Sequence, residues 1–147
     1  MSASFASQAW IDQLNEGLQS AAAVRTESMS WIFGPLLFVV DADEEHGLER
    51  TGIRIDLHEG SIRAVELTDG SEEQRVPFAI GGGLARWKAT FSTGASIVDQ
   101  ILGSKLRVRG DLPTLGRHRA LLAAITSAGG AIETSWQDDQ EPANAQA

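Results

Sequence analysis

Two short runs of alternating apolar and polar residues flank a turn near the middle of this 147-residue chain. In the first run, Ile53, Ile55 and Leu57 alternate with polar residues, and the second run covers residues 62–67. A period of two is typical of strands with one buried face. The intervening residues 58–61 include a glycine and form a tight turn, so the sequence predicts an antiparallel β-hairpin.

Two other segments are strand-like but contain proline, which cannot donate to a sheet ladder. Residues 29–40 are rich in large apolar side chains on both faces, and we expect two strand segments joined at a bulge near Pro35, with both faces covered. Residues 76–80 alternate, and Pro77 favours an edge or bulged position for this strand. The glycines at 81–83 are expected to end it.

Four segments have the apolar spacing of amphipathic helices. Ser7 and Asp111 are suitable N-caps for the first and last of them, and Gly103 closes the third. The helices are expected at residues 7–23, 84–91, 97–102 and 113–128. This order predicts an α+β fold, a five-stranded, mostly antiparallel sheet covered by helices. We expect a single domain over residues 7–136, followed by a disordered acidic tail at 137–147.

Composition narrows the classes of function. The net charge of −8 opposes binding to nucleic acid. The absence of cysteine removes thiol chemistry and disulfides and fits a reducing compartment. The sequence shows neither the pattern of a signal peptide nor an apolar run long enough to span a membrane. A cytoplasmic protein without stable membrane insertion is therefore expected, with no cofactor.

A segment after the third helix, Gly103-Ser104-Lys105-Leu106-Arg107-Val108-Arg109-Gly110-Asp111, resembles the lysine-rich strand "G-K-L-K-V-K-G-D" of the sterol carrier protein 2 family. Ser104 is inserted and two arginines replace lysines, but the apolar residues and the final Gly-Asp keep their order. Trp87 in a short helix, Trp10 in the first helix and Ser30-Trp31 are similar to features of bacterial single-domain members. The resemblance covers roughly residues 7–128.

This resemblance implies that the protein binds, and transfers, an apolar ligand such as a lipid, fatty acyl chain or sterol in a pocket between the sheet and its helices. Large apolar residues near the short helices are the candidate ligand contacts: Phe33, Phe78, Leu84, Trp87, Phe91, Ile97, Ile101 and Leu102. The alternative for these residues is a solid core, because apolar stripes normally mark cores.

Two other functions stay open, a non-catalytic accessory subunit of a lipid or steroid enzyme and a small enzyme acting on a hydrophobic substrate. Asp56 and His58 share one strand face but are expected to face solvent. The strip formed by Lys105, Arg107 and Arg109 can meet acidic head groups in transient membrane contact.

The acidic run at 41–46 lacks the spacing of a calcium loop. The three histidines, at 46, 58 and 118, are expected at the surface or at an edge, so no metal is predicted. The glycines at 81–83 lack the residue pattern of a phosphate-binding loop.

Overall fold

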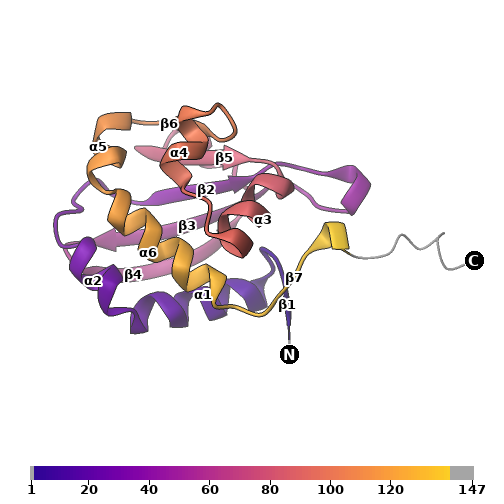
Figure 1. The fold of residues 1–147 in the computed structure, drawn as a ribbon, viewed down its shortest axis with the longest axis horizontal. Coiled ribbons are helices and arrows are strands. Elements are labelled where there is room, and N and C mark those ends of the chain that lie inside the picture. Colours follow the sequence, from indigo (N-terminus) through magenta and orange to yellow (C-terminus); the bar gives the residue numbers. More distant parts are fainter. Residues whose placement is uncertain (1, 140–147) are drawn as a thin grey trace, which may run out of the picture.

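The computed structural model describes residues 2–139. Its helices are α1 (Gln8–Ser20), α2 (Ala22–Glu27), α3 (Leu84–Thr93), α4 (Ile97–Leu102), α5 (Leu112–Arg117) and α6 (Arg119–Gly130). Its strands are β1 (Ala3–Ser4), β2 (Leu36–Val40), β3 (Thr51–His58), β4 (Ser61–Thr68), β5 (Phe78–Gly82), β6 (Arg107–Arg109) and β7 (Thr134–Ser135). Short 3-10 turns lie at Glu44–His46, Ser71–Gln74 and Gln137–Asp139. Figure 1 shows the arrangement.

The main sheet has five strands in the order β4-β3-β2-β5-β6. All neighbours are antiparallel except β2 and β5, which run parallel. The predicted α+β class and the mostly antiparallel five-stranded sheet are therefore confirmed. The parallel pair arises because the β3–β4 hairpin pairs on one side of β2 and the chain then crosses to the other side.

The predicted hairpin is β3 and β4, with His58 paired to Ser61. Its two turn residues, Glu59 and Gly60, both have positive φ angles, of 46° and 87°. This is the backbone geometry of two-residue hairpin turns that match the twist of the strands. Alternation and turn chemistry together made this element predictable.

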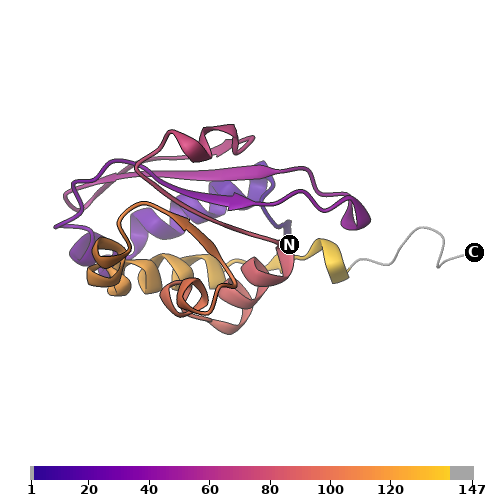
Figure 2. The ribbon, with the colours of Figure 1, turned by 90° about the horizontal axis from the view of Figure 1, so that it is seen from above.

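One face of the sheet carries the main core, and each of the six α-helices within residues 2–139 contributes buried side chains to it. Figure 2 shows the helical layer against the sheet, with the turn at Ser71–Gln74 on the opposite side. On that second face Leu37 and Val39 are buried in a small cluster with Val76 and Ala79. Both faces of β2 are thus covered, as expected from its composition.

The predicted strand over residues 29–35 is wrong. Gly34 has a φ of 89° and Pro35 has no N–H, so the ladder begins only at Leu36. The expectation for Pro77 is also wrong, because β5 lies between β2 and β6 and the proline precedes it.

Gly81 and Gly82 continue β5 rather than ending it. A Cβ on Gly81 would lie 2.4 Å from the Arg107 side chain, and one on Gly82 would lie 2.5 Å from that of Leu106. These glycines therefore permit the segment that contains β6 to pack closely on β5.

The predicted last helix is two helices. The backbone leaves helical geometry at His118, whose φ and ψ are −108° and 25°, and α6 begins at the next residue. The Asp111 cap is confirmed, since its side chain accepts from the Thr114 N–H. The basic strand is shorter than its alternation suggested and pairs with β5 only at residues 107–109.

The packed structure begins earlier than the boundary expected at residue 7. Ala3 pairs with Thr134 in a parallel β1–β7 contact, and Phe5 is buried against Trp10 and Trp136. Of the predicted tail, residues 137–139 form a 3-10 turn, and the remainder lies outside the described residues.

Candidate functional site

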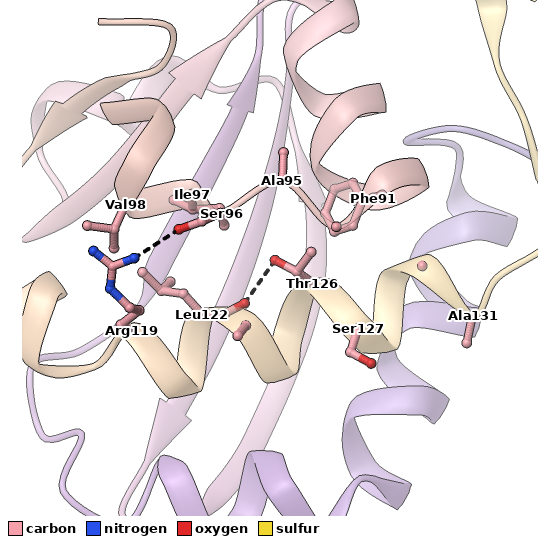
Figure 3. Close-up of a pocket in the computed structure, with 13 residues that line it drawn as sticks. Phe91, Ala95, Ser96, Ile97, Val98, Arg119, Leu122, Thr126, Ser127 and Ala131 are labelled. Carbon is pink, nitrogen blue, oxygen red and sulfur yellow. Dashed lines mark hydrogen bonds between the residues drawn. The ribbon is translucent and has the colours of Figure 1, made fainter. Parts of the chain in front are cut away.

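A groove of about 590 Å³ lies between α6 and the segment formed by the end of α3, its linker and the start of α4. Figure 3 shows the side chains along it. The lining residues are Phe91, Gly94, Ala95, Ser96, Ile97, Val98, Arg119, Leu122, Ala123, Thr126, Ser127, Gly130 and Ala131. This volume is in the range of small-molecule sites.

The contribution of α6 has helical spacing, with lining residues at 119, 122, 123, 126, 127, 130 and 131. Residues three and four apart lie on one helix face. The groove therefore follows one face of α6 from its first residue to its end, and it is elongated.

The groove has a buried floor and exposed walls. Large or branched side chains form the floor, namely Phe91, Ile97, Val98, Leu122 and Thr126, all of which are buried. The walls on the α6 side are mostly glycine, alanine and serine, which project little side chain into the space. The groove stays open because these wall residues are too small to fill it.

Two glycines shape the local geometry of the groove, one at the end of α3 and one near the end of α6. Gly94 ends α3 with a φ of 72°, and the chain turns there before Ser96 caps α4 by accepting from the Asp99 N–H. At the far end a Cβ on Gly129 would lie 2.5 Å from the Phe91 ring. The glycine thus permits close packing of α3 on α6.

In the described part of the chain one charged side chain, that of Arg119, lines the groove. Its Nη1 donates to Asp99 Oδ1 at 3.1 Å and to Ser96 Oγ at 3.4 Å, so it bridges α6 and α4. On the floor, Thr126 Oγ1 donates to the carbonyl of Leu122 in its own helix, at 2.9 Å. The interior of the groove is otherwise apolar or small.

The eight predicted ligand contacts do not form one site. Phe91 and Ile97 line the groove. Leu84, Trp87 and Ile101 are buried in the main core, while Leu102 is 65% exposed. Phe33 and Phe78 contact the Trp31 ring in another part of that core.

The space between sheet and helices, where the ligand was expected, is occupied by protein side chains. Trp10, Trp31, Trp87 and Phe38 are fully buried there. The Trp87 indole N–H donates to the carbonyl of Val39 at 2.9 Å, which satisfies its polar atom inside the core.

His118 was expected at the surface or an edge, and this is wrong. Its ring is buried against Trp31 and Phe33. Nδ1 lies 2.8 Å from the carbonyl of Thr114, and a carbonyl can only accept, so Nδ1 carries the proton. Nε2 lies 3.1 Å from the Ser30 hydroxyl, within hydrogen-bonding distance. The imidazole is a hydrogen-bonded core residue.

Arg107, part of the predicted basic strip, is already neutralised by two carboxylates. It pairs bidentately with Asp41 and with Glu73 at 2.6 to 2.9 Å. The hydrogen bonds that Arg107 donates to Glu73, and then those to Asp41, raise the pKa of the guanidinium. The contact joins β6 to the loops after β2 and before β5, which is a structural role.

Within the acidic run, Asp43, Glu45 and His46 bring candidate metal-ligand atoms within 4.8 Å of one another. The Asp43 carboxylate caps the turn at Glu44–His46 and accepts from His46 Nδ1 at 2.7 Å. This hydrogen bond raises the pKa of His46. The turn accounts for the cluster without an ion.

Sequence reasoning missed most of the groove. The signal was present in the last helix, where small residues recur at 123, 127, 130 and 131 beside the apolar face. A search for large apolar residues passes over such positions, because an open site is marked by side chains that are absent.

Several solved structures share this fold. A crystal structure of sterol carrier protein 2 matches with a TM-score of 0.79 at 18% identity, covering 87% of this chain and 98% of that one. A conserved hypothetical protein from Thermus thermophilus, described as a possible sterol carrier protein, matches with a TM-score of 0.79 at 18% identity, covering 92% and 94%. Sterol carrier protein 2 from Yarrowia lipolytica, in its apo form, matches at 0.53 and 13% identity, covering 82% and 89%.

These matches define the class of the domain. It is an α+β domain with a helical layer on one face of a five-stranded sheet. Its fold is that of sterol carrier protein 2, as the sequence resemblance predicted. No protein-family model and no curated protein matches the sequence. Within residues 2–139, no helix has the length and hydropathy needed to cross a bilayer.

Proposed function

We propose that the protein binds one apolar, lipid-like molecule in the groove along α6, without catalysing its conversion. The observation that carries the proposal is an elongated groove with a buried apolar floor in a fold shared with proteins named as sterol carriers. Burying about ten methylenes at about 0.8 kcal/mol each contributes about 8 kcal/mol before ordering costs. Micromolar dissociation constants are therefore the range to measure.

The sharpest test of ligand binding is a substitution that fills the groove with a large side chain. Ala123 lines the groove, whereas Ala120 is exposed on the same helix and does not. Ala123→Phe is expected to weaken binding of a fluorescent fatty acid about tenfold or more by occupying the site, which is the loss of about 1.4 kcal/mol or more. Ala120→Phe makes the same change in helix propensity and is expected to leave binding unchanged.

Fluorescence titration, with an unlabelled fatty acid as competitor, measures both variants. The proposal fails if the wild-type protein does not bind the probe, or if Ala123→Phe and Ala120→Phe bind it equally. Thermal unfolding of both variants shows that the loss of binding is not a loss of folding.

Transfer between membranes is the finer form of this proposal. The groove is exposed along its walls, which supports exchange of the ligand without unfolding of the helical layer. Movement of the probe between two vesicle populations, with the same two variants, measures transfer. The absence of cysteine supports a reducing compartment, such as the cytoplasm, for this role.

An accessory subunit is the second candidate function. Met29 and Ile32, on either side of the buried Trp31, are 61% and 59% exposed. Large exposed apolar side chains are typical of contact surfaces when they cluster. An accessory subunit does not require the groove. If a partner enzyme keeps its activity with the Ala123→Phe variant, this result supports the accessory function over ligand binding.

A further inference from the structure

We propose that the groove selects elongated amphiphiles with an anionic head group, and that this head group replaces Asp99 as the partner of Arg119. The inference rests on the proposed function, because it assigns the orientation of the ligand in the same groove. The proposed head group is an anion with oxygen acceptors, either a carboxylate or a phosphate.

The lining of the groove is chemically asymmetric. Arg119 lies at one end of the groove and Ala131 at the opposite end (Figure 3). The 12 residues of α6 separate the two ends, a distance of about 18 Å along a helix. Among residues 2–139, Arg119 is the single charged residue of the lining. A long molecule with one charged end fits this arrangement in one orientation.

The Arg119 guanidinium has further N–H donors that can bind a ligand. Its contacts within residues 2–139 all come from Nη1, to Asp99 and Ser96. Nε and Nη2 can therefore donate to a ligand. The planar fork of arginine suits the two oxygens of a carboxylate or phosphate.

The existing partner is easily displaced. The side chains of Arg119 and Asp99 are 50% and 66% exposed, and a single 3.1 Å contact joins them. Exposed ion pairs of this kind contribute little to stability. An anion tethered by a chain in the groove has a high local concentration beside Arg119, and it competes with Asp99 on favourable terms.

The surrounding charges also favour an anion. Helix α6 begins at Arg119, has no side-chain cap and has no acidic residue in its first turn. The N-terminal end of a helix is electropositive. Asp99 is paired with Arg119, so it is the negative group that an incoming anion has to replace.

This arrangement predicts opposite effects of two substitutions. Removing the positive partner, in Arg119→Gln, weakens binding of an anionic amphiphile. Removing its competitor, in Asp99→Asn, strengthens that binding. A neutral ligand of equal chain length is insensitive to both changes, because it takes no part in the competition.

Isothermal titration calorimetry with dodecanoate, dodecyl phosphate and methyl dodecanoate tests these effects. Arg119→Gln is expected to weaken both anions about fivefold, and Asp99→Asn to tighten them about twofold, as partly exposed charge pairs allow. The ester changes by less than about twofold in either variant. High salt weakens the anions alone.

Arg117→Gln is the matched control, since it removes the same charge two residues away. Arg117 donates to Thr114 and does not line the groove. Its substitution is expected to leave all three dissociation constants within about twofold. Thermal unfolding checks the fold of each variant.

The results separate the two proposals. Equal affinity of wild-type protein for acid and ester, or equal weakening of both by Arg119→Gln, overturns the assignment of the head group while lipid binding stands. Binding of none of the three probes overturns the proposed function and this inference together. Binding of the phosphate but not the carboxylate identifies a phosphate head.

Discussion

The core beneath the sheet and the groove beside α6 differ mainly in the size of their side chains. The core contains three fully buried tryptophans, Trp10, Trp31 and Trp87. The walls of the groove contain glycine, alanine and serine instead. Close-packed interiors leave few voids larger than a water molecule. A site therefore forms in this molecule where the side chains are small.

Helix α6 contributes to both regions. Leu121 and Ile125 are fully buried in the core, whereas Ala123 and Ser127 lie on the wall of the groove. The two sets are interleaved along the same 12 residues. One helix thus separates a region that stabilises the fold from a region that is free to bind.

The largest expected effect is a loss of stability when a side chain of the close-packed core is truncated. Trp87→Ala removes a fully buried side chain together with its hydrogen bond to Val39. The free energy of unfolding is expected to fall by about 3–5 kcal/mol, a large share of the total for a domain of this size. Urea denaturation measures it.

If Trp87 instead bordered a ligand cavity, truncation would enlarge that cavity at lower cost. A loss below about 1 kcal/mol would contradict a filled interior. Trp87→Phe is a milder variant that keeps an aromatic ring. Leu102→Ala, at a mostly exposed position, is the control and is expected to change stability by less than about 0.5 kcal/mol.

A smaller effect is expected at Thr90, which joins α3 to α4 inside the core. Its hydroxyl donates to the carbonyl of Arg86 and accepts from Gln100 Nε2, both at 2.8 Å. Thr90→Val leaves the buried amide of Gln100 with only a 3.5 Å contact to Ala95. The expected cost is about 1–2 kcal/mol by chemical denaturation. A neutral result would show that water reaches this amide.

The sequence predicted the fold where local chemistry decided it. The β3–β4 hairpin was recognisable from alternation and from Gly60, and the Asp111 cap from its position before Pro113. Errors occurred where tertiary packing decided. Gly81 and Gly82 look like a strand terminator in isolation, yet they continue β5 because β6 approaches them closely.

The candidate site was less predictable than the fold. Phe91 and Ile97 were identified because they are large and apolar. Leu84 and Trp87 were chosen by the same criterion, but periodicity does not reveal whether an apolar face meets a side chain or a void. That distinction depends on the distance between α4 and α6, which is set by contacts far apart in the sequence.

The smallest effect is expected when the threonine-to-valine change made at Thr90 in the core is repeated on the floor of the groove. Thr126 lies on the groove floor, and its hydroxyl donates only to the Leu122 carbonyl of its own helix. Thr126→Val leaves no buried donor unpaired, so stability is expected to change by less than about 0.5 kcal/mol. The added methyl makes the floor more apolar, and affinity for methyl dodecanoate is expected to rise about twofold. Denaturation and calorimetry measure the two quantities. A cost as large as that of Thr90→Val would mean that the groove is packed like the core, and an unchanged affinity would place the ligand away from the floor.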